Sequence, residues 1–187
     1  MRLPTPSQTV GPFFALLLSP ERHCASLRTD QTPGHPILVE GTVRDGAGHP
    51  VADALIEVWQ ANAAGHCNHP EDPRTQKPDT AFDGFDRVHT DGDGCFAIET
   101  VKPGRVPGPG GQLQAPHLLV GLFARGLLTR LVTRIYFDDE SSTTDDPILA
   151  CIAPNRRVTL IATAHTPSTY RFEVVLQGPR ETVFFDV

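Results

Sequence analysis

The sequence predicts an all-β protein, a two-sheet β-sandwich with long irregular loops and an extended N-terminal arm. Apolar residues alternate with polar ones in several short segments, which is the spacing of half-buried strands. The 187 residues include 18 prolines and 16 glycines, which favours many turns. This length suffices for one domain with a substantial core. We therefore expect a single domain over residues 1–187, with an arm and linker at 1–36 and the sandwich core at 37–187.

The composition argues against polyanionic partners. Sixteen basic against 22 acidic residues give a net charge of −6, so we expect neither a nucleic-acid nor a membrane partner. The apolar run at 13–18 is far shorter than the roughly 18 residues of a membrane span, which favours a cytoplasmic protein. The cysteines form no Cys-x-x-Cys pair, so they neither require an oxidising compartment nor predict a structural zinc site.

The N-terminal arm comprises residues 5–14, TPSQTVGPFF. Pro12 fixes its own φ and biases Gly11 away from the helical region, so this segment is not a helix interior. An arbitrary terminus is most often an ordinary tail, whereas backbone without bulky side chains, as at Gly11, suits the wall of a ligand cavity. Residues 20–36 are polar and predict a linker or a short helix followed by a turn.

Residues 37–60 predict two β-strands joined by a turn. Apolar and polar residues alternate over 39–43 and again over 54–58, and residues 45–48, DGAG, tolerate positive φ. We interpret this stretch as a hairpin of the sandwich with one buried face.

The following loop, 61–87, carries several metal-ligating residue types. A metal cluster and a solvated loop are both possible, and the loop is favoured because no pair has a recognised ligand spacing. The residues concerned are His66, His69, His89, Asp72, Asp79, Asp83 and Asp86. In the next segment, 88–98, Asp91 opens a DGDG string, but the twelfth position of a calcium loop would be Lys102, so a hairpin turn is the better interpretation.

The second half of the chain predicts further strands. A Gly/Pro-rich irregular loop precedes a nearly continuous apolar strand that starts at His117, a residue type that at such a position more often packs in a core than binds a metal. Arg134 lies on an alternating strand, where a rim position is the simplest interpretation. The expected elements are strands at 117–123 and 127–139, a short helix at 147–153, and closing strands at 158–164, 170–177 and 182–185.

Taken together, these segments resemble the intradiol ring-cleavage dioxygenases, non-haem iron enzymes that open catechols between the two hydroxyls. The resemblance is carried by the arm TPSQTVGP, by ALIEVWQAN at 54–62, by TRIYFDD at 133–139, and by the C-terminal YRFEVVLQG. It extends over residues 5–186 and is weakest at 20–36. A β-sandwich fold is what this resemblance implies.

In iron-bearing members of that family, two tyrosinates and two histidines hold ferric iron. The corresponding positions here are Cys67, Val106, His117 and Leu119, so one imidazole is retained and three ligands are missing. The resemblance implies that this chain binds no metal and carries no catalytic residue of its own. Fe(III) would be held by a homologous iron-bearing beta subunit, and the two chains would assemble into a higher alpha–beta oligomer.

The resemblance also implies a substrate and the residues that contact it. Arg134 would meet the carboxylate of protocatechuate, which O2 cleaves to 3-carboxy-cis,cis-muconate in aromatic catabolism. Thr9, Gly11 and Pro12 would form part of the cavity wall.

Two other classes of function remain open at this point. A non-catalytic binding module, carbohydrate-recognising or transthyretin-like, would share the alternating strands. A self-sufficient metalloenzyme could instead use His66, His69, His89 and His117 in a rearranged site.

Overall fold

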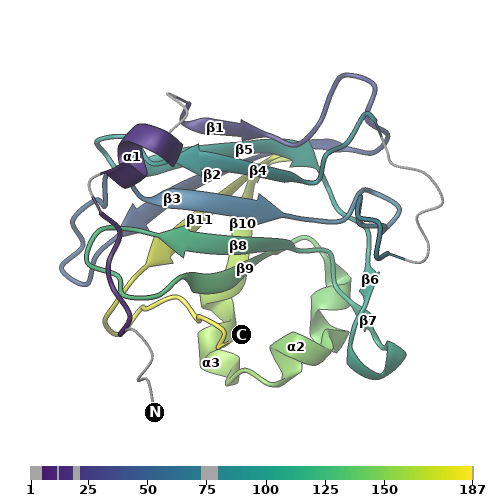
Figure 1. Cartoon of the computed structure of the whole chain (residues 1–187). Helices are drawn as coiled ribbons and strands as arrows, with labels where there is room; N and C mark the ends of the chain where they lie inside the picture. Colours follow the sequence, from purple (N-terminus) through teal and green to yellow (C-terminus); the bar gives the residue numbers. More distant parts are fainter. Residues whose placement is uncertain (1–5, 12, 19–21, 73–79, 187) are drawn as a thin grey trace, which may run out of the picture.

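The computed structural model describes residues 6–11, 13–18, 22–72 and 80–186 (Figure 1). The strands are β1 (Cys24–Ser26), β2 (Pro36–Arg44), β3 (Leu55–Trp59), β4 (Phe85–His89), β5 (Cys95–Val101), β6 (Val106–Pro107), β7 (Leu113–Gln114), β8 (Leu118–Phe123), β9 (Leu131–Phe137), β10 (Ile161–Thr166) and β11 (Thr169–Val175). The helices are α1 (Phe13–Leu18), α2 (Pro147–Ala150) and α3 (Pro154–Arg157), with 3-10 turns η1 (Pro109–Gly111), η2 (Ser141–Asp145) and η3 (Val158–Leu160). In this described part, every helix is too short or too polar to cross a membrane.

The predicted β-rich class is confirmed, but the predicted division into two separate sheets is not. Nine strands form one mixed sheet in the order β1-β5-β2-β11-β10-β9-β8-β3-β4, and β6 pairs with β7. The two halves of the sheet are joined by a two-residue parallel pairing of β10 with β9. The edge strands β1 and β4 approach each other, and the Ser26 backbone N–H donates to Asp86 Oδ2 at 2.9 Å. The sheet is therefore nearly closed.

The predicted hairpins at 37–60 and 88–98 are wrong in their pairing. Although β2 and β3 follow one another in sequence, β2 pairs with β5 and β11, whereas β3 pairs with β4 and β8. In the same way β4 pairs with β3, and β5 pairs with β1 and β2. Each turn therefore carries the chain from one half of the sheet to the other. The turn after β4 is closed by Asp91, whose Oδ1 accepts the backbone N–H groups of Asp93 and Cys95 at 2.9 and 2.8 Å.

The main core lies between the two halves of the sheet. Inward-facing residues of β2, β5 and β11 on one side and of β3, β8 and β9 on the other form one buried cluster. Gly41 on β2 is required there, because a Cβ at this position would lie 2.1 Å from the ring of Phe96. A second cluster lies on the outer face of β9, where Tyr136 packs with Leu149 of α2 and Leu160 of η3.

Four segments differ from the sequence-based expectations. The expected strand at 158–164 begins only at Ile161 of β10, because residues 158–160 form η3. The segment expected to be a linker contains β1, which pairs with β5 and buries Ala25 in the main core. Residues 182–185, expected to be a closing strand, contribute only a bridge between Phe185 and Val132 among the described residues. The expected helix at 147–153 is α2, which begins at Pro147 and ends at Ala150.

Candidate functional site

An outward-facing row of side chains crosses β4, β3, β8 and β9. The strand register places Phe85 beside Trp59, Trp59 beside Leu119, and Leu119 beside Arg134. All four are partly exposed, whereas inward-facing neighbours such as Val58 are buried, as the alternation of side chains along strands requires. The row therefore brings Arg134 next to Leu119, one of the positions at which the family resemblance expects an iron ligand.

The guanidinium of Arg134 is held along one edge by neutral groups. Its Nη1 donates to Gln114 Oε1 at 2.6 Å and to the Tyr136 hydroxyl at 3.2 Å. The ring of Phe185 lies 5.7 Å from Arg134 Cζ. Among the residues that the structure describes, Arg134 forms no ion pair, and its Nη2 and Nε form no hydrogen bond. The charge is thus positioned without being neutralised by direct contact with a carboxylate.

A buried aspartate determines which way the Tyr136 hydroxyl points. The hydroxyl donates to Asp146 Oδ1 at 3.3 Å, and Asp146 is 1% exposed. The same carboxylate accepts the backbone N–H groups of Ile148 and Leu149, each at 2.8 Å, and of Ala115 at 2.7 Å, so it caps α2 and fixes the entry to β8. Burial raises the pKa of Tyr136, which keeps its proton on the bond to Asp146 and its lone pair toward the arginine.

His117 lies against this network in its neutral form. Its ring centroid is 5.5 Å from that of Tyr136, and its Nδ1 is 2.8 Å from the carbonyl oxygen of Ala115, which requires Nδ1 to carry a proton. Burial, followed by the nearby charge of Arg134, lowers the pKa of His117 from 6.5 to about 4. His117 is therefore an uncharged hydrogen-bond donor at neutral pH.

The residues at the four expected ligand positions do not fit ferric iron. Val106 and Leu119 are aliphatic, and Val106 lies opposite Gln114 in the pairing of β6 with β7. Cys67 lies in a loop where its backbone N–H donates to Asp72 Oδ2 at 2.9 Å. Two aliphatic side chains cannot coordinate a metal, and ferric iron favours the hard oxygen ligands that are missing here.

The alternative histidine site is not assembled by the described residues either. The ring of His69 lies 6.0 Å from that of Trp59, whereas His89 Nε2 lies 3.1 Å from the carbonyl oxygen of Leu18 in α1. Over residues 6–11, 13–18, 22–72 and 80–186, no group of three or more His, Cys, Asp or Glu side chains is arranged to hold a metal ion. Asp79, one of the candidates in the loop, lies outside the described residues.

The arm residues lie on a different part of the chain from Arg134. Thr9 Oγ1 accepts the backbone N–H of Gly126 at 2.7 Å, and Gly126 follows β8, whereas His117 precedes that strand. Gly11 is exposed, a Cβ added to it would meet no atom within 4 Å, and Pro12 lies outside the described residues. The structure therefore does not bring Thr9 and Gly11 together with Arg134 within one chain.

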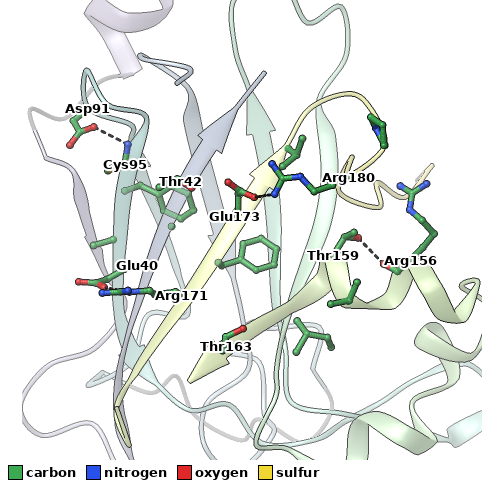
Figure 2. A pocket seen from close by; sticks show the side chains of 18 of the residues that line it. Glu40, Thr42, Asp91, Cys95, Arg156, Thr159, Thr163, Arg171, Glu173 and Arg180 are labelled. Atoms are coloured by element: carbon green, nitrogen blue, oxygen red, sulfur yellow. Dashed lines mark hydrogen bonds and ion pairs between the residues drawn. The ribbon is translucent and has the colours of Figure 1, made fainter. Parts of the chain in front are cut away.

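A cavity of about 860 Å³ lies on the other half of the sheet, over β2, β5, β10 and β11 (Figure 2). Two of its arginines are paired with carboxylates: Arg171 Nε lies 3.6 Å from Glu40 Oε2, and Arg180 Nη1 lies 3.1 Å from Glu173 Oε2. A third, Arg156, donates from Nη2 to the backbone carbonyl of Glu181 at 2.7 Å. None of the described residues predicted to bind substrate or to mark a ligand position lines this cavity. We therefore place the candidate site around Arg134 and not in this cavity.

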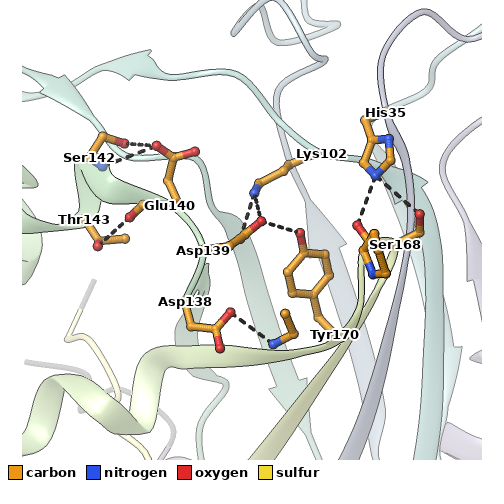
Figure 3. Close-up of polar contacts among 11 residues, drawn as sticks. His35, Lys102, Asp138, Asp139, Glu140, Ser142, Thr143, Ser168 and Tyr170 are labelled. Carbon is orange, nitrogen blue, oxygen red and sulfur yellow. Dashed lines mark hydrogen bonds and ion pairs between the residues drawn. The ribbon is translucent and has the colours of Figure 1, made fainter.

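A second cation lies in a comparable cluster near the end of β5 (Figure 3). Lys102 Nζ donates to both oxygens of Asp139 at 2.8 Å, and the Tyr170 hydroxyl donates to the same carboxylate at 3.0 Å. Lys102 also lies over the rings of Phe137 and Tyr170, 5.3 and 5.6 Å from their centroids. This cation, unlike Arg134, is neutralised by direct contact.

Sequence reasoning missed Gln114, Tyr136 and Asp146 as parts of the site. The Asp-Pro string at 146–147 does signal a capped helix start, because aspartate is a preferred N-cap and proline suits the first turn. That signal predicts the start of the helix, but it does not predict that the same carboxylate accepts the hydrogen bond of the Tyr136 hydroxyl. Gln114 lies on the two-residue strand β7, which is too short for the sequence to show a periodicity that would orient it.

Comparisons with known proteins identify the family. Residues 9–178 match the family model described as Dioxygenase. The chain is 42% identical to the protocatechuate 3,4-dioxygenase alpha chain of Burkholderia cepacia, with 98% of this chain and 97% of that protein covered. It is 35% identical to the beta chain from the same organism, with 82% of this chain and 69% of that protein covered.

A solved structure agrees with these sequence matches. The dioxygenase domain of a dioxygenase carbohydrate-binding protein fusion from Streptomyces sp. SirexAA-E superposes with a TM-score of 0.60 at 29% identity, covering 96% of this chain and 99% of that one. Sequence and fold lead to the same conclusion: the chain belongs to the family of intradiol ring-cleavage dioxygenases.

Proposed function

We propose that this chain is the non-iron alpha subunit of a protocatechuate 3,4-dioxygenase and acts only with an iron-bearing beta subunit. The observation that carries the proposal is its end-to-end similarity to a protein named as such an alpha chain, covering 98% and 97% of the two sequences. The side chains around Arg134 support it, because Leu119 and Val106 cannot serve as metal ligands. The similarity to a beta chain supports a partnership of two homologous subunits.

The proposed reaction is the intradiol cleavage of 3,4-dihydroxybenzoate by O2. The bond between the two hydroxyl-bearing carbons breaks, and both oxygen atoms enter the product, 3-carboxy-cis,cis-muconate. Ferric iron held by the beta subunit would supply the activation of the catechol and of O2. We assign the complex to the cytoplasm, to higher alpha–beta oligomers, and to aromatic catabolism.

This chain would contribute binding and exclusion of water. Arg134 would bind the substrate carboxylate through its unused guanidinium donors, since a guanidinium matches the geometry of a carboxylate. Thr9, Gly11 and Pro12 would form a wall of the cavity through the arm. Because Thr9 is anchored to Gly126 and lies away from Arg134, the contribution of the arm does not depend on Arg134 within this chain.

The first experiment tests the role of Arg134 in the purified alpha–beta complex. Losing a charge-assisted hydrogen bond costs about 1.5–3 kcal/mol, roughly one to two decades in affinity. We expect Arg134→Ala to raise the KM for protocatechuate by that factor. The KM for catechol, which lacks the carboxylate, is expected to stay the same. An unchanged KM for protocatechuate would remove Arg134 from the substrate site.

The second experiment tests the division of labour between the chains. Iron content and protocatechuate-dependent O2 uptake are measured for this chain alone and for the co-expressed pair. We expect neither iron nor turnover for the chain alone, and both in a complex that co-purifies. Stoichiometric iron with turnover in the isolated chain would overturn the proposal and would favour a rearranged histidine site.

A further inference from the structure

The partners of Arg134 share one property, which is that they carry no charge. Gln114 is 7% exposed, and its amide orientation is fixed because Nε2 donates to the carbonyl oxygen of Pro107 at 3.1 Å. Its Oε1 must therefore face Arg134 Nη1, 2.6 Å away. The second partner, the Tyr136 hydroxyl, accepts from the guanidinium because it donates its own hydrogen bond to Asp146.

Two other outward-facing arginines of the same half of the sheet have a charged partner instead. Arg87 Nε lies 2.8 Å from Glu57 Oε1, and Arg130 Nη2 lies 3.5 Å from Glu57 Oε2. A glutamate in place of Gln114 would give Arg134 the same kind of partner with almost no change in size. The uncharged amide therefore has a specific consequence: it holds the guanidinium in place and leaves its charge available.

We propose that Gln114 is a specificity-determining residue, which positions Arg134 as an unpaired cation for a carboxylate-bearing aromatic substrate. The inference rests on the proposed function. With Nη1 bound to Gln114 and Tyr136, the Nε and Nη2 donors lie on the other edge of the guanidinium. A carboxylate would bind this edge with two parallel hydrogen bonds. Gln114 itself touches the arginine and not the substrate.

The test is Gln114→Glu in the alpha–beta complex, with Gln114→Met as the matched control. Both variants lose the bond to Pro107, but only the glutamate adds an anion next to Arg134. We expect Gln114→Glu to raise the KM and the dissociation constant for protocatechuate tenfold or more. We expect Gln114→Met to change them only about threefold. Dissociation constants are measured by titration calorimetry without O2, which separates binding from turnover.

Catechol is the internal control for structural damage. We expect its KM and the kcat of the complex to be nearly the same in Gln114→Glu and Gln114→Met, because catechol has no carboxylate to compete with the new anion. If the two variants weaken protocatechuate equally, or if Gln114→Glu weakens catechol as much as protocatechuate, the proposal is overturned.

A second pair of variants keeps the proposal testable if Gln114→Glu does not assemble. Leu119 lies beside Arg134 on the neighbouring strand and is partly exposed, so Leu119→Glu introduces a carboxylate without disturbing Gln114. Leu119→Gln is its neutral control. Only the glutamate variant is expected to weaken protocatechuate binding by tenfold or more, and equal effects would overturn the role of the unpaired charge.

The results also separate this inference from the proposed function. If Arg134→Ala leaves protocatechuate binding unchanged, the carboxylate-binding role of this chain fails, and the role of Gln114 fails with it. If Arg134→Ala weakens binding but Gln114→Glu behaves like Gln114→Met, the proposed function stands and only the inference about Gln114 fails.

Discussion

The chain contains two clusters built from the same three kinds of residue, a cation, a tyrosine and an aspartate. In the cluster of Lys102, Tyr170 and Asp139, the ammonium and the phenol both donate directly to the carboxylate (Figure 3). In the cluster around Arg134, the tyrosine hydroxyl stands between the guanidinium and the aspartate. The order of the three groups therefore differs, although their chemistry is similar.

That difference in order determines what each cation can do. Burial alone would raise the pKa of Asp139, but the hydrogen bonds from Lys102 and Tyr170 outweigh it and lower the pKa below its ordinary value of 3.8. This is the behaviour of an ion pair, in which each charge satisfies the other. The carboxylate oxygens of Asp146 instead accept hydrogen bonds from three backbone N–H groups and from the hydroxyl of Tyr136. The cation of the first cluster is therefore neutralised within the fold, and the cation of the second is left available for a ligand.

The largest expected difference concerns the two aspartates. Asp146→Ala leaves several buried donors without a partner and removes the cap of α2, so we expect it to lower the free energy of unfolding by about 3 kcal/mol or more. Asp139→Ala breaks a pair that is 46% exposed on the aspartate side, and we expect a loss of about 1 kcal/mol or less. Urea unfolding of the purified variants measures both. Equal losses would mean that Asp146 is not the structural anchor of its cluster.

A second contrast is the dependence of stability on pH. His117 has a pKa of about 4 in the folded chain and an ordinary value of 6.5, so the unfolded chain binds a proton between these values and the folded chain does not. Stability therefore falls as the pH drops from about 6.5 toward 4, by up to about 3 kcal/mol. The lowered pKa of Asp139 acts in the same direction, but only below about 4, where the unfolded carboxylate takes up its proton.

The control for this contrast is His117→Gln, which keeps a donor for the carbonyl of Ala115 but does not titrate. Unfolding free energies of wild type and variant are compared at pH 7 and pH 4.5. We expect the variant to lose about 2.4 kcal/mol less than wild type over this interval. If both lose the same amount, the neutral imidazole beside Arg134 does not govern the pH response.

The sequence predicted the strands better than their partners. Alternation over 39–43 correctly identified Val39, Gly41 and Val43 as inward-facing, because burial of one face depends only on the local period of two. The pairing of β2 with β5 and β11, in place of β3, depends on contacts between residues far apart in sequence. The string DGAG predicts a turn, but it does not indicate which half of the sheet the chain enters next.

The residues of the candidate site also fall into a predicted group and an unpredicted group. The resemblance pointed to His117, Leu119 and Arg134. In the structure His117 lies just before β8, and Leu119 of β8 lies opposite Arg134 of β9. Gln114 and Asp146 could not be predicted, because one reaches the site from the two-residue strand β7 and the other from the cap of α2. Each acts through a hydrogen bond whose geometry no local pattern encodes. The electrostatic state of Arg134 depends on those two residues.

The smallest expected effect is also the most direct comparison of the two cations. Lys102→Met removes an ion pair that is partly exposed, and we expect it to lower the free energy of unfolding by about 0.5–1 kcal/mol. Arg134→Met removes a partly buried charge that has no ionic partner among the described residues. The desolvation cost of that charge disappears with it and offsets the loss of its hydrogen bonds to Gln114 and Tyr136. We expect the stability of Arg134→Met to change by less than about 0.5 kcal/mol or to rise.

The effects of the two substitutions on protocatechuate binding to the alpha–beta complex should have the opposite order of size. Lys102→Met should leave the dissociation constant for protocatechuate unchanged, since Lys102 is already satisfied by Asp139. Arg134→Met should weaken it by roughly one to two decades. Urea midpoints and calorimetric titrations of the same two variants give all four values. A marked loss of stability in Arg134→Met would show that this guanidinium is a structural group like Lys102, because a cation kept for a ligand contributes little to the fold that carries it.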